Sequence, residues 1–215
     1  MRIGVIGTGR MGSTLGTLWA KAGHEIMFSL PHDASTLRTL LESIGPLASS
    51  GTPQEAVQFG DVLLLAVLWE RQADVLRELG SLQGKILIDV SNPFKKEGDT
   101  WVIAIPDGKT AGEITAQRAH DARVVKAYNT MRAESFRDKS RPTGPEQLVV
   151  FLSGDDRLAK ETVATLIRDS GFAPVDLGPM RNVSLQEAPN GPFYVSTSMS
   201  EDKARALLAE LHIQG

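Results

Sequence analysis

The stretch "VIGTGRMGSTLG", from Val5 to Gly16, lies near the start of this 215-residue chain and decides how its fold is interpreted. It contains the spacing G-x-G-x-x-G at Gly7, Gly9 and Gly12. Glycines at this spacing serve either a tight turn alone or the binding of a cofactor's phosphates. The residues on both sides of the stretch separate these two interpretations.

The context of the glycines favours phosphate binding. Residues 2–6 have the continuous apolar pattern of a buried strand, and residues 24–29 form a second such run. Between them, apolar residues recur at helical spacing from Met11 onward, through Leu15 and Trp19. A glycine-rich turn between a strand and a helix, with a second strand after the helix, is typical of a dinucleotide-binding βαβ unit.

Each glycine has its own role in such a unit. Gly7 permits the tight turn, Gly9 lets the backbone approach a pyrophosphate, and Gly12 lets the helix pack closely against the strand. The N–H groups at the helix N-terminus then face the phosphates. The sequence therefore predicts a nucleotide site here rather than a structural turn only.

The end of the second strand indicates which nucleotide binds. An NAD site usually has Asp or Glu at this point, for the ribose hydroxyl groups. Here residues 28–32 contain no carboxylate, and Asp33 is better placed to cap the next helix. Ser29 and His32 supply neutral or cationic donors, and Arg10 adds a positive charge. These residues suit a 2′-phosphate, so the sequence favours NADP over NAD.

Strands and helices alternate along the rest of the chain. Further apolar strands are expected at residues 61–67, 85–90, 124–128, 148–153 and 174–177. Capping boxes at Thr52 and Thr110 predict helix starts. Apolar strands of this kind need cover on both faces, which indicates the α/β class with a Rossmann-type, mostly parallel, doubly wound sheet. We expect an NAD(P)-binding domain over residues 1–178, and a short C-terminal segment over residues 179–215 that packs on the site or on a dimer partner.

The composition excludes several classes of protein. With 41% hydrophobic residues and a net charge of −3, the chain has the composition of a globular protein and no broad basic surface for nucleic acid. The longest apolar run, residues 62–68, is too short to span a membrane, and the first residues lack a signal-peptide pattern. There is no cysteine, and the four histidines lack metal-ligand spacing. We therefore expect a cytoplasmic protein without a metal site or membrane contact.

Several motifs, in their order and spacing, resemble the NADPH-dependent reductases of the 5-deazaflavin coenzyme (factor 420) and their bacterial relatives. The matching stretches cover almost the whole chain and include "IGTGRMGSTLG" from Ile6, "AGHEIMFS" from Ala22, "GDVLLLAVLWE" from Gly60, "GKILIDVSNPF" from Gly84, "VVKAYNT" from Val124 and "DLGPMRN" from Asp176. The resemblance implies a single Rossmann-type domain, usually a homodimer. It also implies hydride transfer between the nicotinamide C4 and the deazaflavin C5.

The same resemblance implies which residues contact the cofactor. The residues on the phosphate loop are Gly7, Thr8, Gly9, Arg10, Met11 and Gly12. Ser29 falls where the family contacts the 2′-phosphate, with Leu30 where a basic residue is common. Ala66 and Val67 follow the third apolar strand, where the nicotinamide half of the cofactor would pass, and Leu68 stands where the family often has proline.

Two further positions concern the reacting rings. Trp69 either lines the ring pocket or packs in the core under the following helix. Asn92 and Pro93 follow the next strand, where nicotinamide and acceptor would meet. Asn92 either hydrogen-bonds to the carboxamide or forms an Asn-Pro turn. We expect the acceptor ring between these two loops and the segment around Met180.

No catalytic side chain is expected for this chemistry. Hydride transfer needs close approach and orientation of two rings, and the reactive atoms belong to the cofactors. Lys126 lies in an apolar strand with Tyr128 on the same face. We expect its ammonium group to reach solvent at the strand end rather than to act as a buried base.

Three functions remain open. The first is an NADPH-dependent oxidoreductase that acts on a deazaflavin or a flavin-like acceptor such as FMN or FAD. The second is an NADPH-dependent flavin or ferric reductase, a chemistry suggested by the N-terminal domains of the membrane metalloreductases. The third is a non-catalytic module that binds NADP(H) and senses its redox state.

Overall fold

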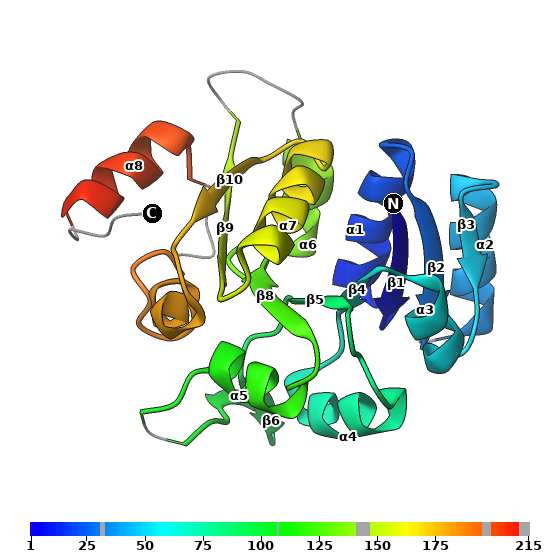
Figure 1. Cartoon of the computed structure of the whole chain (residues 1–215), viewed down its shortest axis with the longest axis horizontal. Helices are drawn as coiled ribbons and strands as arrows, with labels where there is room; N and C mark the ends of the chain where they lie inside the picture. The colour runs from blue at the N-terminus through cyan, green and yellow to red at the C-terminus, as the bar shows by residue number, and fades with distance from the viewer. Residues whose placement is uncertain (31–32, 107, 141–146, 195–198, 211–215) are drawn as a thin grey trace.

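The computed structural model describes residues 1–30, 33–106, 108–140, 147–194 and 199–210. An eight-stranded sheet runs through it, with helices on both faces (Figure 1). The strands, in their order across the sheet, are β10 (Ala173–Asp176), β9 (Val149–Gly154), β8 (Arg123–Ala127), β5 (Ile86–Asp89), β4 (Val62–Leu65), β1 (Arg2–Ile6), β2 (Glu25–Ser29) and β3 (Ala48–Ser50).

The sheet is mostly parallel, which confirms the predicted fold class. Among the described strands of this eight-stranded sheet, the one antiparallel pair joins β8 to β9, where Val125 lies opposite Gly154. Strands β9 and β10 are parallel to each other and therefore run against the other six. The sequence did not predict this reversal, because a strand buried on both faces has the same apolar pattern in either direction. It also missed the short edge strand β3, whose residues are Ala-Ser-Ser.

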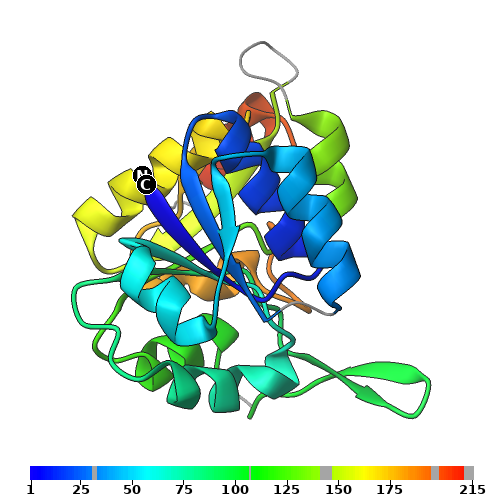
Figure 2. The ribbon, with the colours of Figure 1, turned by 90° about the vertical axis from the view of Figure 1, so that its right-hand side faces the viewer.

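Helices cover both faces of the sheet (Figure 2). The described helices are α1 (Arg10–Lys21), α2 (Ala34–Ile44), α3 (Pro53–Phe59), α4 (Trp69–Leu79), α5 (Ala111–Arg118), α6 (Ala133–Lys139), α7 (Arg157–Asp169), α8 (Glu201–Glu210) and the 3₁₀ helix η1 (Met180–Gln186). Apolar residues of α1, α6 and α7 form one core against the sheet, with α2 packed at its edge. Residues of α3, α4 and η1 form a second core on the opposite face. This division is the doubly wound arrangement.

Helices α2, α3 and α5 begin at the capping residues that the sequence indicates. The hydroxyl of Thr52 accepts from the N–H of Glu55 and the Glu55 carboxylate accepts from the N–H of Thr52, so the predicted capping box is formed. At the start of α5, the hydroxyl of Thr110 accepts from the N–H of Glu113. The N–H groups of the first two residues of α5 instead donate to the side chain of Glu187. The distant C-terminal segment therefore completes this helix cap.

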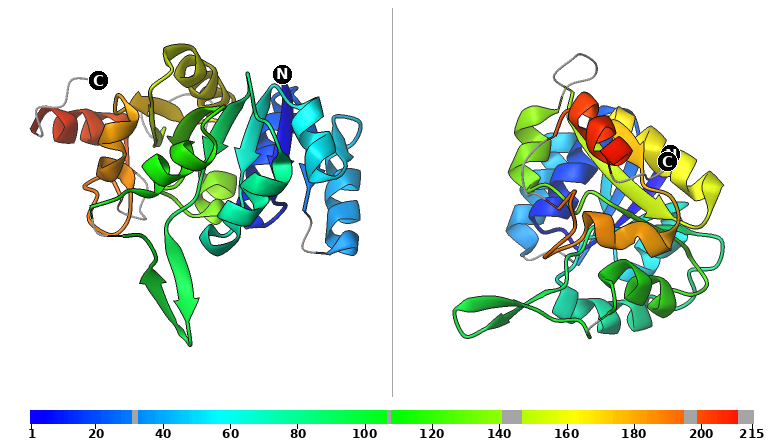
Figure 3. Two further views of the ribbon diagram at one scale, coloured as in Figure 1. Left: turned by 60° about the horizontal axis from the view of Figure 1, so that its bottom comes forward. Right: turned by 90° about the vertical axis from the view of Figure 1, so that its left-hand side faces the viewer.

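A two-stranded hairpin follows β5 and projects from the body of the molecule (Figure 3). It consists of β6 (Phe94–Glu97) and β7 (Thr100–Ile103), joined by Gly98 and Asp99. Gly98 has a φ of 59°, the left-handed conformation that a two-residue hairpin turn needs. This hairpin was not predicted from the sequence, although Gly-Asp between two short runs is a known hairpin signal.

The C-terminal segment packs on the β9–β10 end of the sheet. Phe193, Met199 and Ala204 join Phe151 and Val175 in a third apolar cluster. No helix within the described residues is long and apolar enough to cross a bilayer. The boundary at residue 178, and contact with a dimer partner, stay predictions.

Candidate functional site

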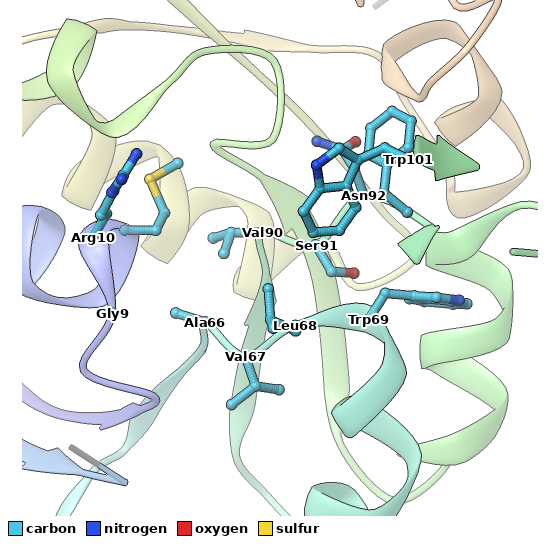
Figure 4. Close-up of a pocket in the computed structure, with 12 residues that line it drawn as sticks. Gly9, Arg10, Ala66, Val67, Leu68, Trp69, Val90, Ser91, Asn92 and Trp101 are labelled. Atoms are coloured by element: carbon cyan, nitrogen blue, oxygen red, sulfur yellow. The ribbon is translucent and has the colours of Figure 1, made fainter. Parts of the chain in front are cut away.

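A cavity of about 850 Å³ opens at the carboxyl ends of β4 and β5, beside the start of α1 (Figure 4). Its lining residues are Gly9, Arg10, Met11, Ala66, Val67, Leu68, Trp69, Val90, Ser91, Asn92, Phe94 and Trp101. The order of the strands reverses between β1 and β4. Open α/β sheets bind their ligands outside the carboxyl ends of the strands at such a switch point.

The three glycines of the first loop differ in what surrounds them. Gly7 has a φ of 101°, and a Cβ added there would lie 2.5 Å from the carbonyl oxygen of Ala66. A Cβ on Gly12 would lie 2.0 Å from the carbonyl oxygen of Gly7. No atom of the described structure lies within 4 Å of a Cβ placed on Gly9. Gly7 and Gly12 are thus required by the fold itself, whereas Gly9 faces open space at the cavity.

The start of α1 is suited to an anion. Its N-cap is Gly9, so no side chain occupies the end of the helix. The N–H groups of the first turn have no intrahelical acceptor, and the helix dipole favours negative charge there. The Arg10 side chain is 89% exposed, and its guanidinium lies 3.7 Å from the carboxylate of Glu134. Backbone donors and one exposed cation therefore border the open side of Gly9, which is the arrangement that binds phosphate groups.

The turn after β2 is held by hydrogen bonds inside the sheet. The Thr8 hydroxyl donates to the carbonyl oxygen of Ser29 at 2.8 Å. Ser29 is fully buried, and its own hydroxyl donates to the carbonyl oxygen of Val5 at 2.9 Å. The Ser29 hydroxyl therefore orders this turn in the structure. Its predicted contact with a 2′-phosphate is not tested, and the predicted contact at His32 lies outside the described residues.

Asp33 caps α2, as the sequence indicates. Its carboxylate accepts from the N–H and the hydroxyl of Thr36 and from the hydroxyl of Ser35. These hydrogen bonds, that of Ser35 first, lower the pKa of Asp33 from its ordinary value of 3.8. A carboxylate engaged in this way is not free for a ribose hydroxyl, which fits the preference for NADP.

The loop after β4 forms one wall of the cavity. Ala66, Val67 and Leu68 line it, and the Leu68 side chain is 62% exposed. Trp69 lines the same cavity but is only 7% exposed, and its Nε1 donates to the carbonyl oxygen of Ala104 at 2.9 Å. The structure therefore combines the two alternatives for Trp69, since its ring is packed at the base of the hairpin and also borders the cavity.

The loop after β5 forms the floor. Asn92 lines the cavity, and its side-chain amide donates to the carbonyl oxygen of Asn129 at 2.8 Å. The Asn129 amide donates in return to Oδ1 of Asn92 at 3.2 Å. Pro93 is buried behind this loop, and its carbonyl oxygen accepts from the N–H of Ala104 at 2.7 Å. Asn92 is thus fixed at the cavity by Asn129, and Pro93 fixes the base of the hairpin.

A buried ion cluster lies directly under this floor. Nζ of Lys126 is 2.9 Å from Oδ2 of Asp89, 3.1 Å from Oε1 of Glu187 and 2.6 Å from the carbonyl oxygen of Ser91. The expectation that Lys126 reaches solvent is wrong, because its side chain is fully buried. Burial lowers the pKa of Lys126, but the charges of Asp89 and Glu187 outweigh burial and raise the pKa above 10.5. The lysine therefore stays charged inside the protein.

The cluster holds the loop that carries Ser91. Oδ1 of Asp89 accepts from the N–H of Ser91, and Oδ2 accepts from the hydroxyl of Thr115. The amide of Gln72 donates to the Ser91 hydroxyl at 3.1 Å. This cluster was not predicted from the sequence. The available signal was a charged residue, Asp89 or Lys126, within each of two otherwise apolar strands, and the structure places these two residues opposite each other in β5 and β8.

Two other expectations are corrected by the structure. Tyr128 does not lie on the face of Lys126, because its φ of 62° breaks the alternation of the strand and turns its ring toward Trp19 and Phe136. Met180 does not line the cavity, because it is buried in the opposite core and packs near Gly112. The far wall of the cavity is formed instead by Phe94 and Trp101 of the hairpin.

Comparisons with known proteins agree with this fold. Residues 2–93 match the family described as NADP oxidoreductase, coenzyme F420-dependent. A structure of a putative F420-dependent NADP-reductase from Arthrobacter sp. FB24 is 28% identical, with a TM-score of 0.75 over 85% of this chain and 87% of that chain. A hypothetical protein, SMa0349, from Sinorhizobium meliloti is also 28% identical, with a TM-score of 0.79 over 94% of this chain and 96% of that chain.

A similar curated protein is metalloreductase STEAP3 of Rattus norvegicus. It is 30% identical over 187 residues, which are 87% of this chain and 36% of that protein. The chain therefore spans about a third of the length of the curated metalloreductases that it matches. Together these findings confirm the resemblance derived from the sequence motifs.

Proposed function

We propose that the chain transfers a hydride between NADP(H) and a deazaflavin or flavin-like acceptor, since residues 2–93 match the family of F420-dependent NADP oxidoreductases. One observation carries this proposal. A single cavity runs from the open side of Gly9, across the ends of β4 and β5, to an aromatic wall on the hairpin. It offers an anion site at one end and space for a flat ring at the other.

The residues near Gly9 fit the phosphates of a dinucleotide. Gly9 leaves open space, the first turn of α1 supplies N–H donors, and Arg10 supplies an exposed cation. Gly7, Thr8 and Gly12 shape the loop, and Met11 lines the cavity beside it. In this proposal His32 serves the 2′-phosphate end, and Ser29 holds the end of β2 that leads to it through its hydrogen bond to Val5.

The other predicted residues would hold the nicotinamide end. Ala66 and Val67 form one wall, Asn92 forms the floor, and Trp69 and Pro93 support the loops behind them. NADPH, when bound, supplies the hydride from its C4, and the acceptor's second hydrogen comes from water as a proton. The chain's own residues orient the two rings and exclude water, which suffices for a hydride transfer between cofactors. No side chain has to act as an acid or base.

The nature of the cavity wall favours a flat, largely apolar acceptor. Val67, Leu68, Val90, Phe94 and Trp101 present apolar surface to the cavity. A small hydroxy acid would need charged partners and a proton acceptor on this wall. A second candidate, reduction of metal ions through an ordinary flavin, is favoured by the similarity to metalloreductase STEAP3. In that case FMN or FAD would occupy the same wall.

Stopped-flow oxidation of NADPH tests the proposal. The wild-type protein is mixed with deazaflavin coenzyme, FMN and FAD in separate experiments, and the Gly9→Val variant serves as the control. We expect rapid oxidation with at least one acceptor and none above background in the variant. If the protein binds NADPH but reduces no acceptor, the hydride-transfer proposal fails and the redox-sensor hypothesis is favoured.

A further inference from the structure

Trp101 is an unusual residue in this structure. Among the described residues, the large hydrophobic side chains that are well exposed are those of Met1, Leu68, Trp101 and Leu158. Two of these four, Leu68 and Trp101, line the same cavity. Trp101 is 55% accessible on a projecting arm, and exposed apolar side chains that gather at one cavity are typical of a ligand-binding groove or an interface.

The hairpin holds Trp101 at the cavity from a fixed base. The N–H of Ala104 donates to the carbonyl oxygen of Pro93, and Trp69 donates to the carbonyl oxygen of Ala104. At the start of the hairpin, the N–H of Phe94 donates to the carbonyl oxygen of Asn92. The hairpin is thus tied to both loops that form the cavity, the one after β4 and the one after β5.

The strand register decides which hairpin side chains face the cavity. Phe94 pairs with Ile103 and Lys96 pairs with Trp101, so Phe94 and Trp101 are on one face of the hairpin. Both line the cavity, and Figure 4 shows the indole of Trp101 above the floor that carries Ser91 and Asn92. The indole therefore lies across the cavity from the loop after β4.

We propose that Trp101 is the stacking platform for the acceptor, a planar fused-ring compound of the deazaflavin or flavin class. This inference rests on the proposed function and adds the position of the acceptor within it. The acceptor ring lies between the Trp101 indole and the nicotinamide, with its edge toward Leu68. Offset stacking of a fused ring on an indole buries two apolar faces and does not require specific hydrogen bonds to the edge of the ring. Trp101 therefore selects for ring shape, while the anion site at Gly9 selects for the dinucleotide.

Tryptophan fluorescence provides a binding test that does not depend on turnover. The chain has three tryptophans, and Trp19 and Trp69 are buried whereas Trp101 is exposed. With NADP⁺ present, oxidised FMN or deazaflavin is titrated into the wild type, and no reaction takes place. We expect quenching of the Trp101 emission on binding, and loss of that quenching in Trp101→Phe. Because the phenyl ring keeps a stacking surface, we expect the affinity of Trp101→Phe for the acceptor to fall by less than about threefold. The absorbance of the acceptor measures this affinity independently of tryptophan emission.

Trp101→Ala tests the energetic contribution, with Leu158→Ala as the matched control of equal exposure away from the cavity. In Trp101→Ala we expect acceptor binding weaker by about tenfold, the size of a lost stacking contact, with NADP⁺ affinity unchanged within about twofold. Leu158→Ala changes neither. If the wild type reduces an acceptor and Trp101→Ala binds and reduces it equally well, the platform is refuted while the proposed function stands. If Trp101→Ala instead turns a dimer into a monomer at unchanged acceptor affinity, the platform is likewise refuted and the hairpin is an interface.

Discussion

The substitution Lys126→Met isolates the contribution of the buried ion cluster. It replaces the ammonium group by a thioether of similar length and leaves Asp89 and Glu187 without the cation that lies within 3.1 Å of both. Removing one partner of a buried ion pair typically costs about 3–5 kcal/mol, because the remaining charge is uncompensated. Both carboxylates keep their backbone N–H donors, at Ser91 and at the start of α5, which limits the loss to this range.

Equilibrium unfolding in urea measures this effect at neutral pH. With a urea m-value of about 2 kcal/mol/M, the expected loss lowers the midpoint by about 2 M. Arg2→Met is the control, since its ion pair with Asp61 has a similar distance of 3.1 Å but both side chains are more than half exposed. We expect a loss below about 1 kcal/mol there.

A second variant tests the cause. In the Lys126→Met background, Asp89→Asn removes one of the two uncompensated charges, so part of the lost stability should return. A loss of less than about 1 kcal/mol in Lys126→Met would refute the assignment of an electrostatic cluster. The assignment is also refuted if Asp89→Asn lowers the free energy of unfolding by the same amount in the Lys126→Met background as in the wild type.

Three further predictions follow from the same structure. Gly9→Val should abolish NADP binding in calorimetry while the thermal unfolding temperature stays near that of the wild type, because the new side chain enters open space; unchanged affinity would contradict the phosphate site. NADPH should bind at least about tenfold more tightly than NADH, about 1.4 kcal/mol, in a fluorescence titration, and equal affinities would contradict the interpretation of the β2 end. Burial raises the pKa of Tyr128 above its ordinary value of 10.0, so its contribution to stability is complete below pH 10 and is lost as the pH rises further. Above pH 10, the free energy of unfolding measured in urea should therefore fall less steeply with pH in Tyr128→Phe than in the wild type, by about 1.4 kcal/mol per pH unit. Equal slopes in the two proteins would show that Tyr128 does not contribute to the pH dependence of stability.

The parts of the fold that depend on local pattern were predictable. The glycine spacing with a strand before it and a helix after it predicted β1, α1 and β2, because Gly7 and Gly12 each meet a specific steric demand of the turn. Asp33, Thr52 and Thr110 predicted helix starts, because capping is a contact over three residues. These features are set within a few residues of sequence.

The missed features depend on contacts over long distances in sequence. Lys126 is stabilised inside the protein by Asp89 and Glu187, and Glu187 lies in the C-terminal segment. Its burial therefore follows from tertiary packing and not from its own strand. The segment around Met180 was expected at the cavity because it follows a strand end. However, β10 belongs to the reversed pair of strands, so its carboxyl end lies at the opposite edge of the sheet from the carboxyl ends of β4 and β5. The hairpin that carries Trp101 forms the far wall of the cavity instead.

The most direct test of the central claim follows the hydride itself. NADPH labelled with deuterium at C4, on one face or the other, is incubated with the protein and deazaflavin coenzyme, and the reduced acceptor is analysed by mass spectrometry. A hydrogen bound to carbon at C5 of the deazaflavin does not exchange with water, so the label is retained. The account predicts transfer of deuterium to the acceptor from one of the two labelled forms only, because a nicotinamide held against the loop after β4 would present a single face to an acceptor stacked on Trp101. Absence of label in the acceptor from both forms would contradict it.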